Sequence, residues 1–83
     1  MSMRFEHSPD EDALYVAFDD RDVAYTVNIS CQDRYERGID YGADGTPIGV
    51  EFLYVSRGVD LTDVPRADEI ASLLREHQIR ELA

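Results

Sequence analysis

Apolar and polar side chains alternate with a period of two over the N-terminal part of the chain, which is the pattern of half-buried β-strands. The clearest run covers residues 23–31, and shorter runs cover residues 3–7, 13–18, 38–41 and 48–54. Strands that follow one another through short turns favour antiparallel neighbours. The alternation therefore predicts an antiparallel β-meander of about five strands.

Three polar segments separate these runs. Ser8–Glu11 contains a proline that sets the backbone for a type I turn. Asp19–Asp22 is interpreted as a hairpin connection, and Gly42–Gly45 ends in Asp-Gly, a strong hairpin signal between alternating runs. Each segment is thus predicted to join two sequential strands.

The pattern changes to a helical period near the C-terminus. Pro65 suits a first helical turn, because its missing N–H has no partner there in any case. One apolar stripe follows at helical spacing, made of Ala67, Ile70, Leu73, Leu74 and His77. The sequence predicts a single α+β domain over residues 1–83. It comprises an antiparallel sheet (1–55), a linker (56–64) and an amphipathic C-terminal helix (65–80) packed on one sheet face.

The two faces of the predicted sheet differ in character. Large apolar side chains line one face, whereas small or polar ones line the other. A helix about 10 Å wide covers two or three strands spaced about 4.8 Å apart. A five-stranded apolar face is wider than that, so a second subunit or another protein is expected to cover the remainder. We therefore expect a homodimer.

The net charge of the chain limits the classes of partner that it is expected to bind. The chain has 18 acidic residues against eight arginines and no lysine, for a formal net charge of −10. Such a chain repels phosphate backbones, so no nucleic-acid partner is expected, and a basic protein partner suits it better. Cys31 is the only cysteine, and neither an export signal nor a membrane-spanning stretch is visible. We expect a cytoplasmic protein with no membrane partner.

Segment 40–51 partly matches a calcium-binding loop. Four residues occupy positions 1, 5, 6 and 12 of that pattern, namely Asp40, Asp44, Gly45 and Glu51. Gly42 stands where a ligand belongs and Pro47 where an aliphatic residue belongs. The flanking segments alternate like strands rather than helices. A plain hairpin is the favoured interpretation, and no metal or cofactor is expected.

His7 is the other candidate for chemistry. Together with Asp10 and Asp12 it could act as a general base with an orienting carboxylate. Such a role needs a concave site, and the adjacent Ser8 points to the opposite face of a strand. The favoured interpretation is a strand-end histidine beside solvated turn acids. His77 is interpreted as a packing residue and Cys31 as a small apolar residue.

Aromatic residues on the predicted strands are the candidates for a protein interface. Half-buried tyrosines combine a large contact area with a polar tip, which suits an interface. The interaction residues predicted on this ground are Tyr15, Tyr25, Tyr41, Tyr54 and Phe52.

Two motifs carry a resemblance to a known family. They are Asp12-Ala13-Leu14-Tyr15-Val16 and the stretch from Asp40-Tyr41-Gly42-Ala43-Asp44-Gly45 to Gly49-Val50-Glu51-Phe52-Leu53. Over residues 3–57 the chain resembles the small bacterial family called domain of unknown function 2283. It departs from the family pattern at His7, Ser8, Gly42, Pro47 and Tyr54. The resemblance implies a fold but no activity and no catalytic residues. Some members resemble partners in toxin–antitoxin-like gene pairs.

The sequence favours a non-catalytic protein-interaction domain that acts as a homodimer. Two alternatives stay open. One is an antitoxin-like acidic protein that neutralises a basic partner. The other is a small hydrolase or metal-dependent enzyme with a site near His7, which requires a concave surface there.

Overall fold

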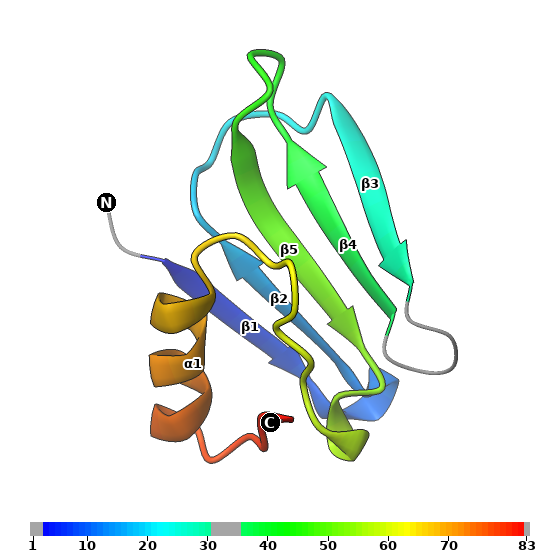
Figure 1. Cartoon of the computed structure of the whole chain (residues 1–83), viewed down its shortest axis with the longest axis vertical. Coiled ribbons are helices and arrows are strands. Elements are labelled where there is room, and N and C mark those ends of the chain that lie inside the picture. Colours follow the sequence, from blue (N-terminus) through cyan, green and yellow to red (C-terminus); the bar gives the residue numbers. More distant parts are fainter. Residues whose placement is uncertain (1–2, 31–35, 83) are drawn as a thin grey trace.

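The computed structural model describes residues 3–30 and 36–82. Five strands form one antiparallel sheet (Figure 1), namely β1 (Arg4–Ser8), β2 (Ala13–Ala17), β3 (Tyr25–Ser30), β4 (Glu36–Tyr41) and β5 (Pro47–Leu53). Within the described residues, the sheet is accompanied by two 3₁₀ turns and one helix, namely η1 (Pro9–Glu11), η2 (Val55–Arg57) and α1 (Ala67–Glu76). The prediction of an α+β fold with an antiparallel sheet and one C-terminal helix is confirmed.

The order of the strands differs from the simple meander that the short turns suggested. The sheet runs β1-β2-β5-β4-β3, so β5 lies between β2 and β4, and β3 forms the far edge. The pattern of buried side chains explains this order. Ile48, Gly49, Val50 and Phe52 of β5 are buried, as expected of a central strand. The polar-to-apolar alternation of β3 suits an edge.

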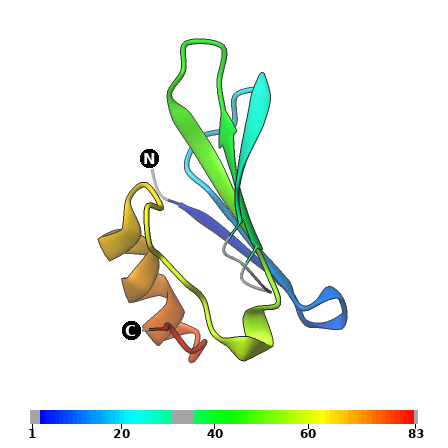
Figure 2. The same ribbon diagram turned by 45° about the vertical axis from the view of Figure 1, so that its right-hand side comes forward.

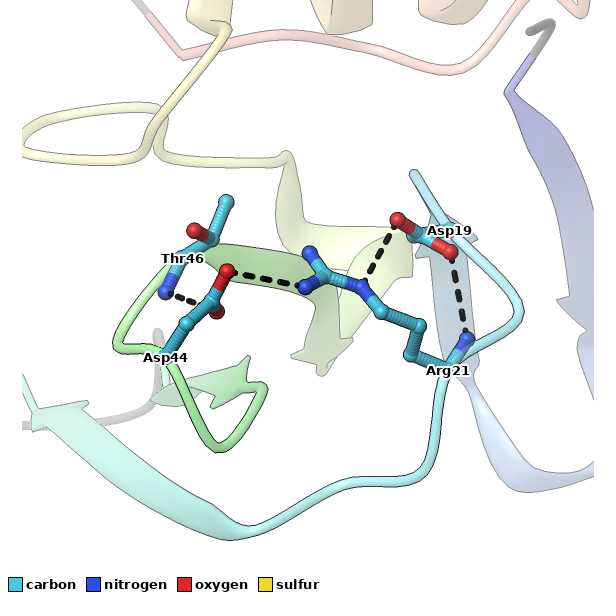
Figure 3. A network of polar contacts seen from close by, with 4 residues as sticks. All are labelled: Asp19, Arg21, Asp44 and Thr46. Carbon is cyan, nitrogen blue, oxygen red and sulfur yellow. Dashed lines mark hydrogen bonds and ion pairs between the residues drawn. The ribbon is translucent and has the colours of Figure 1, made fainter.

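The connection from β2 to β3 is therefore a crossing and not a hairpin. It passes the ends of β5 and β4, where the Phe18 amide donates to the Ile48 carbonyl (2.8 Å) and the Ala24 amide to the Tyr41 carbonyl (2.8 Å). Arg21 fixes the middle of the connection (Figure 3). Its Nε donates to Asp19 (2.9 Å) and its Nη1 to Asp44 in the β4–β5 turn (3.0 Å).

The helix is shorter than the predicted span of 65–80. Arg66 and Gln78 adopt left-handed backbone conformations, with φ of 57° and 59°, and neither can continue a right-handed helix. Pro65 consequently precedes the helix instead of occupying its first turn. Ile70, Ala71 and Leu74 form its buried stripe. Within the described residues, no helix has the length and apolar character needed to cross a membrane.

One layer covers one face of the sheet (Figure 2), and it consists of α1, the linker before it and the segment after it. The helix lies over the β1 and β2 side, where His77 stacks on Phe5 (ring centroids 4.0 Å apart) and Arg66 lies 5.0 Å from the Phe18 ring. The linker is part of the core, because its Val59 and Val64 are buried. Helix and linker together shield the β1, β2 and β5 side of the sheet.

A buried arginine holds the linker against β4. Arg37 is 4 % exposed, and its Nη1 donates to the carbonyl oxygens of Asp60 (3.2 Å) and Thr62. Asp60 also lies within ion-pair distance, at 3.9 Å. The guanidinium thus joins two main-chain carbonyls of the linker to β4.

Candidate functional site

The covering layer stops short of β3. Three large apolar residues remain about half exposed here, namely Tyr25 (49 %) and Val27 (44 %) on β3 and Val23 (50 %) just before the strand. We call these three residues the β3 strip. Tyr25 and Val27 lie on the same sheet face as the core, because the register places Val27 opposite the buried Ile39. At Tyr25 and Val27 the strip is therefore an uncovered continuation of the core face.

Tyr25 is held in place by its neighbour on β4. Its ring stacks on that of Tyr41, with centroids 5.1 Å apart and planes 12° from parallel. Tyr41 is half-buried and packs against the core cluster, as does Ile29 at the other end of β3. The strip is consequently backed by ordered side chains, which suits a contact surface.

The strip carries no charge at neutral pH, although the whole chain has a formal net charge of −10. The residues of β3 between Tyr25 and Ser30 include no acidic or basic side chain. On the opposite face of the strand, the Thr26 hydroxyl donates to Asp40 (2.6 Å). The most apolar exposed surface of β3 thus lies on a locally neutral element.

Asp40 is the centre of a polar network on the face without the helix. Besides Thr26, it accepts a hydrogen bond from the Tyr15 hydroxyl (2.7 Å). The Tyr15 side chain passes over Gly49, where an added Cβ would lie 2.1 Å from the hydroxyl oxygen. Burial raises the pKa of Tyr15, and the hydrogen bond to Asp40 adds to this shift. The network joins three strands, because Tyr15 of β2 and Thr26 of β3 both donate to Asp40 of β4.

The five predicted interaction residues fall in different places. Tyr25 and Tyr41 form the stacked pair at β3, and Tyr15 lies on the opposite face. Tyr54 is 43 % exposed just after β5. Phe52 differs from the four tyrosines, because it is only 1 % exposed and lies in the core opposite Leu14.

A pocket of about 380 Å³ opens at His7. Three segments line it, from the β1–β2 turn, η2 and the chain after α1, with the residues His7, Pro9, Asp12, Val55, Ser56, Gln78, Ile79 and Arg80. The size is at the lower end of small-molecule sites. The concave surface that an enzymatic site near His7 requires is therefore present, and Asp12 lines it while Asp10 does not.

The polar groups of this pocket already serve the fold. Ser56 donates to Asp12 through both its amide and its hydroxyl, each at 2.7 Å. Arg80 donates to the Arg57 carbonyl (2.9 Å). Within residues 3–30 and 36–82, no side chain hydrogen-bonds to His7. A general base needs a partner that orients its ring, and here the carboxylate orients a serine instead.

The residues of the calcium-loop pattern do not converge. Asp44 accepts hydrogen bonds from the Thr46 amide (3.0 Å) and from Arg21, and both contacts, the Thr46 amide first, lower its pKa to about 2. Asp40 belongs to the network with Tyr15, and Glu51 pairs with Tyr15 in the strand register. Across the described part of the chain, no three potential metal-binding side chains cluster.

Sequence reasoning missed several residues of these sites. Ser56 and Arg80 lie far from His7 in the chain and carry no motif, so only tertiary structure brings them to the pocket. Arg37 sits in a strand whose alternation places it on the core face, and that was the available signal. The prediction for Cys31 falls outside the described residues.

Comparison with family models gives one match. The family described as "Protein of unknown function (DUF2283)" matches residues 4–56, which is more than half of the chain. The chain belongs to this family. The DUF2283 match includes all five strands and ends within η2. Neither the search of curated proteins nor the search of solved structures gave a match.

The DUF2283 segment thus corresponds to the sheet, while most of the covering layer follows it. Asp12 precedes β2 and Ser56 follows β5, so both lie at the same end of this antiparallel pair, where they hydrogen-bond to each other. The β3 strip belongs to the family segment, whereas the three C-terminal residues of the His7 pocket lie beyond it.

Proposed function

We propose that this chain is a non-catalytic protein-interaction module that self-associates as a homodimer through the β3 side of its sheet. One observation carries the proposal: the core face continues onto β3, where Tyr25 and Val27 are about half exposed, with the half-exposed Val23 just before the strand. Burying the exposed half of such a side chain contributes about 1 kcal/mol, so an interface there gains from every member of the strip.

The charge distribution favours a second copy at this place. Two chains of formal net charge −10 repel each other, and opposed carboxylates would add to the repulsion. The β3 strip is free of charge and so allows close approach. A strongly basic partner would gain nothing from the strip itself, because the strip offers no carboxylate.

Sedimentation velocity over a wide concentration range tests the proposal. We expect a monomer–dimer equilibrium that Tyr25→Glu abolishes, because it puts a charge into the interface. Tyr54→Glu is the matched control, since Tyr54 has nearly the same exposure (43 % against 49 %) at a distant site. Circular dichroism verifies that both variants fold. A wild-type chain that stays monomeric, or a dimer that survives Tyr25→Glu, would contradict the proposal.

An acidic neutraliser of a basic partner is the first alternative, and the net charge supports it. This function would use the dispersed carboxylates rather than the β3 strip. Affinity capture from host lysate should then recover a basic protein near one-to-one. Binding should weaken as salt rises, because exposed charges are screened, and it should be unaffected by Tyr25→Glu.

Hydrolysis at the His7 pocket is the second alternative, and the cavity supports it. Hydrolysis of p-nitrophenyl acetate by the wild type and by His7→Ala tests it directly. Equal rates in the two proteins would remove His7 as a general base, whereas a rate lost only in the variant would favour an enzyme.

A further inference from the structure

The two edges of the sheet differ in their protection against strand pairing. The β1 edge carries Arg4 and Glu6, Arg4 pairs with Glu6 and Asp20, and Pro9 follows the strand. Charged side chains and proline are the usual means by which an edge strand avoids another chain. The side chains of β1 thus disfavour pairing of this edge with a strand of another chain.

The edge at β3 has none of these devices. Its sequence from Tyr25 to Ser30 contains no charge and no proline, and its pairing with β4 is continuous over all six residues without a bulge. No described strand pairs with its outer side. Its outward amide and carbonyl groups are therefore available for a further strand, and such edges recruit one.

From this contrast we infer that β3 pairs antiparallel with β3 of a second copy, around a two-fold axis at Val27, to form a continuous ten-stranded sheet. The inference rests on the proposed homodimer and specifies how the two copies meet. A two-fold axis perpendicular to the sheet keeps the core faces of both copies on the same side.

In a register centred on Val27, apolar residues lie opposite apolar residues and polar residues lie opposite polar residues. Val27 faces Val27 of the second copy, Tyr25 faces Ile29, and on the opposite sheet face Thr26 faces Asn28. Aromatic and β-branched residues stabilise each other when they lie opposite across antiparallel strands. No pair in this register brings two charges together, so the acidic character of the chain does not oppose it.

The available area favours edge pairing over packing of the two faces alone. Three half-exposed side chains amount to a few hundred Å² at most. A stable interface buries about 800 Å² on each partner. Apolar contact alone therefore falls short, whereas edge pairing adds main-chain hydrogen bonds along the whole strand. It also surrounds Tyr25 and Val27 with neighbours on both sides.

A cysteine scan along β3 in a Cys31→Ser background tests the geometry. Directly opposed residues of antiparallel strands have Cα atoms about 4.5–5.5 Å apart, within reach of a disulfide. Only Val27 faces its own counterpart in the proposed register. Val27→Cys should therefore form a covalent dimer on mild oxidation. Tyr25→Cys and Ile29→Cys, whose counterparts are displaced along the strand by about 13 Å, should remain monomeric on denaturing gels.

Hydrogen exchange supplies the second measurement on the unmodified chain. Edge pairing should protect alternate amides of β3 as concentration rises, while packing of faces would leave their pattern unchanged. Cross-linking that peaks at another position, or a dimer by sedimentation without alternate protection, would overturn the edge-paired geometry and leave the proposed homodimer intact. A chain that is monomeric by sedimentation would overturn both.

Discussion

One row of residues crosses the core face of the sheet and shows how the burial of similar side chains differs between the β2 side and the β3 side. Val16 on β2, Val50 on β5, Ile39 on β4 and Val27 on β3 lie side by side in the register. Their exposures are 0 %, 0 %, 3 % and 44 %. The residue type is nearly constant, and two things change along the row: the covering layer ends before β3, and β3 has no described strand on its outer side. Burial at a given position is thus decided by what lies above and beside the strand.

The same contrast separates the two edges. The β1 edge is charged and lies beside the helix, with His77 stacked on Phe5. The β3 edge is uncharged and uncovered. The bare apolar region and the unprotected edge thus occur at the same strand, and the proposed contact with a second copy rests on this coincidence.

The boundary between the covered and bare sides depends most on Arg37. Replacing it by alanine should lower the free energy of unfolding by about 3 kcal/mol, because the buried guanidinium and its hydrogen bonds to the Asp60 and Thr62 carbonyls are lost and the linker loses its anchor. Urea unfolding measures the loss. Arg75→Ala on the exposed side of α1 is the control and should change stability by less than about 0.5 kcal/mol. Equal effects of the two substitutions would show that Arg37 does not hold the linker.

The row itself provides a matched pair of substitutions. Val16→Ala removes two methyl groups from a fully buried site and should cost about 2 kcal/mol. Val27→Ala removes the same atoms from a site that is 44 % exposed in one copy and should cost less than about 1 kcal/mol when the protein is dilute. Thermal unfolding at low concentration compares them. A rising cost of Val27→Ala with concentration would sharpen the contrast, because dimerisation then buries the site.

The face without the helix offers a smaller test. Gly49→Ala should cost about 1 kcal/mol, since the new Cβ displaces the Tyr15 hydroxyl and breaks its hydrogen bond to Asp40. The same substitution in a Tyr15→Phe background should cost less, because no hydrogen bond remains to be lost. A cost that is equal in both backgrounds, measured by urea unfolding, would show that the hydrogen bond does not contribute and would assign the effect to the clash with the ring, whose Cζ lies 2.7 Å from the added Cβ, or to the backbone.

The smallest effect concerns the turn beside the bare strand. The pKa of Asp44 is lowered from 3.8 to about 2 by the Thr46 amide and Arg21, so the folded state binds this proton more weakly than the unfolded state. The resulting stability is present above pH 4 and is lost as the pH falls from about 4 to about 2. Asp44→Asn should flatten this part of the stability profile. Circular dichroism follows unfolding between about pH 4 and pH 2. If the variant loses stability over this range as the wild type does, the Asp44 turn does not contribute to the pH dependence of stability.

The sequence by itself determined the local structure of this chain. A period of two can arise only from strands, so the five strands and the Asp-Gly turn at Gly45 (φ 83°) follow from the alternation and from glycine's access to that conformation. The width of one helix against five strands also indicated that the helix alone cannot cover the apolar face, and the exposed residues of the β3 strip lie at the part that it leaves. These inferences rest on properties of neighbouring residues.

Tertiary structure alone decided which strands became neighbours and which distant residues came into contact. Alternation is identical for every antiparallel partner, so it could not place β5 between β2 and β4. Phe52 shows the same limit, because the alternation of β5 indicates the sheet face on which Phe52 lies but not whether the helix and linker cover that face. The Asp12–Ser56 contact spans 44 residues, and nothing local specifies such a pairing. The strand order reflects the burial of Val50 and its neighbours at the centre of the sheet, which is a property of the whole fold.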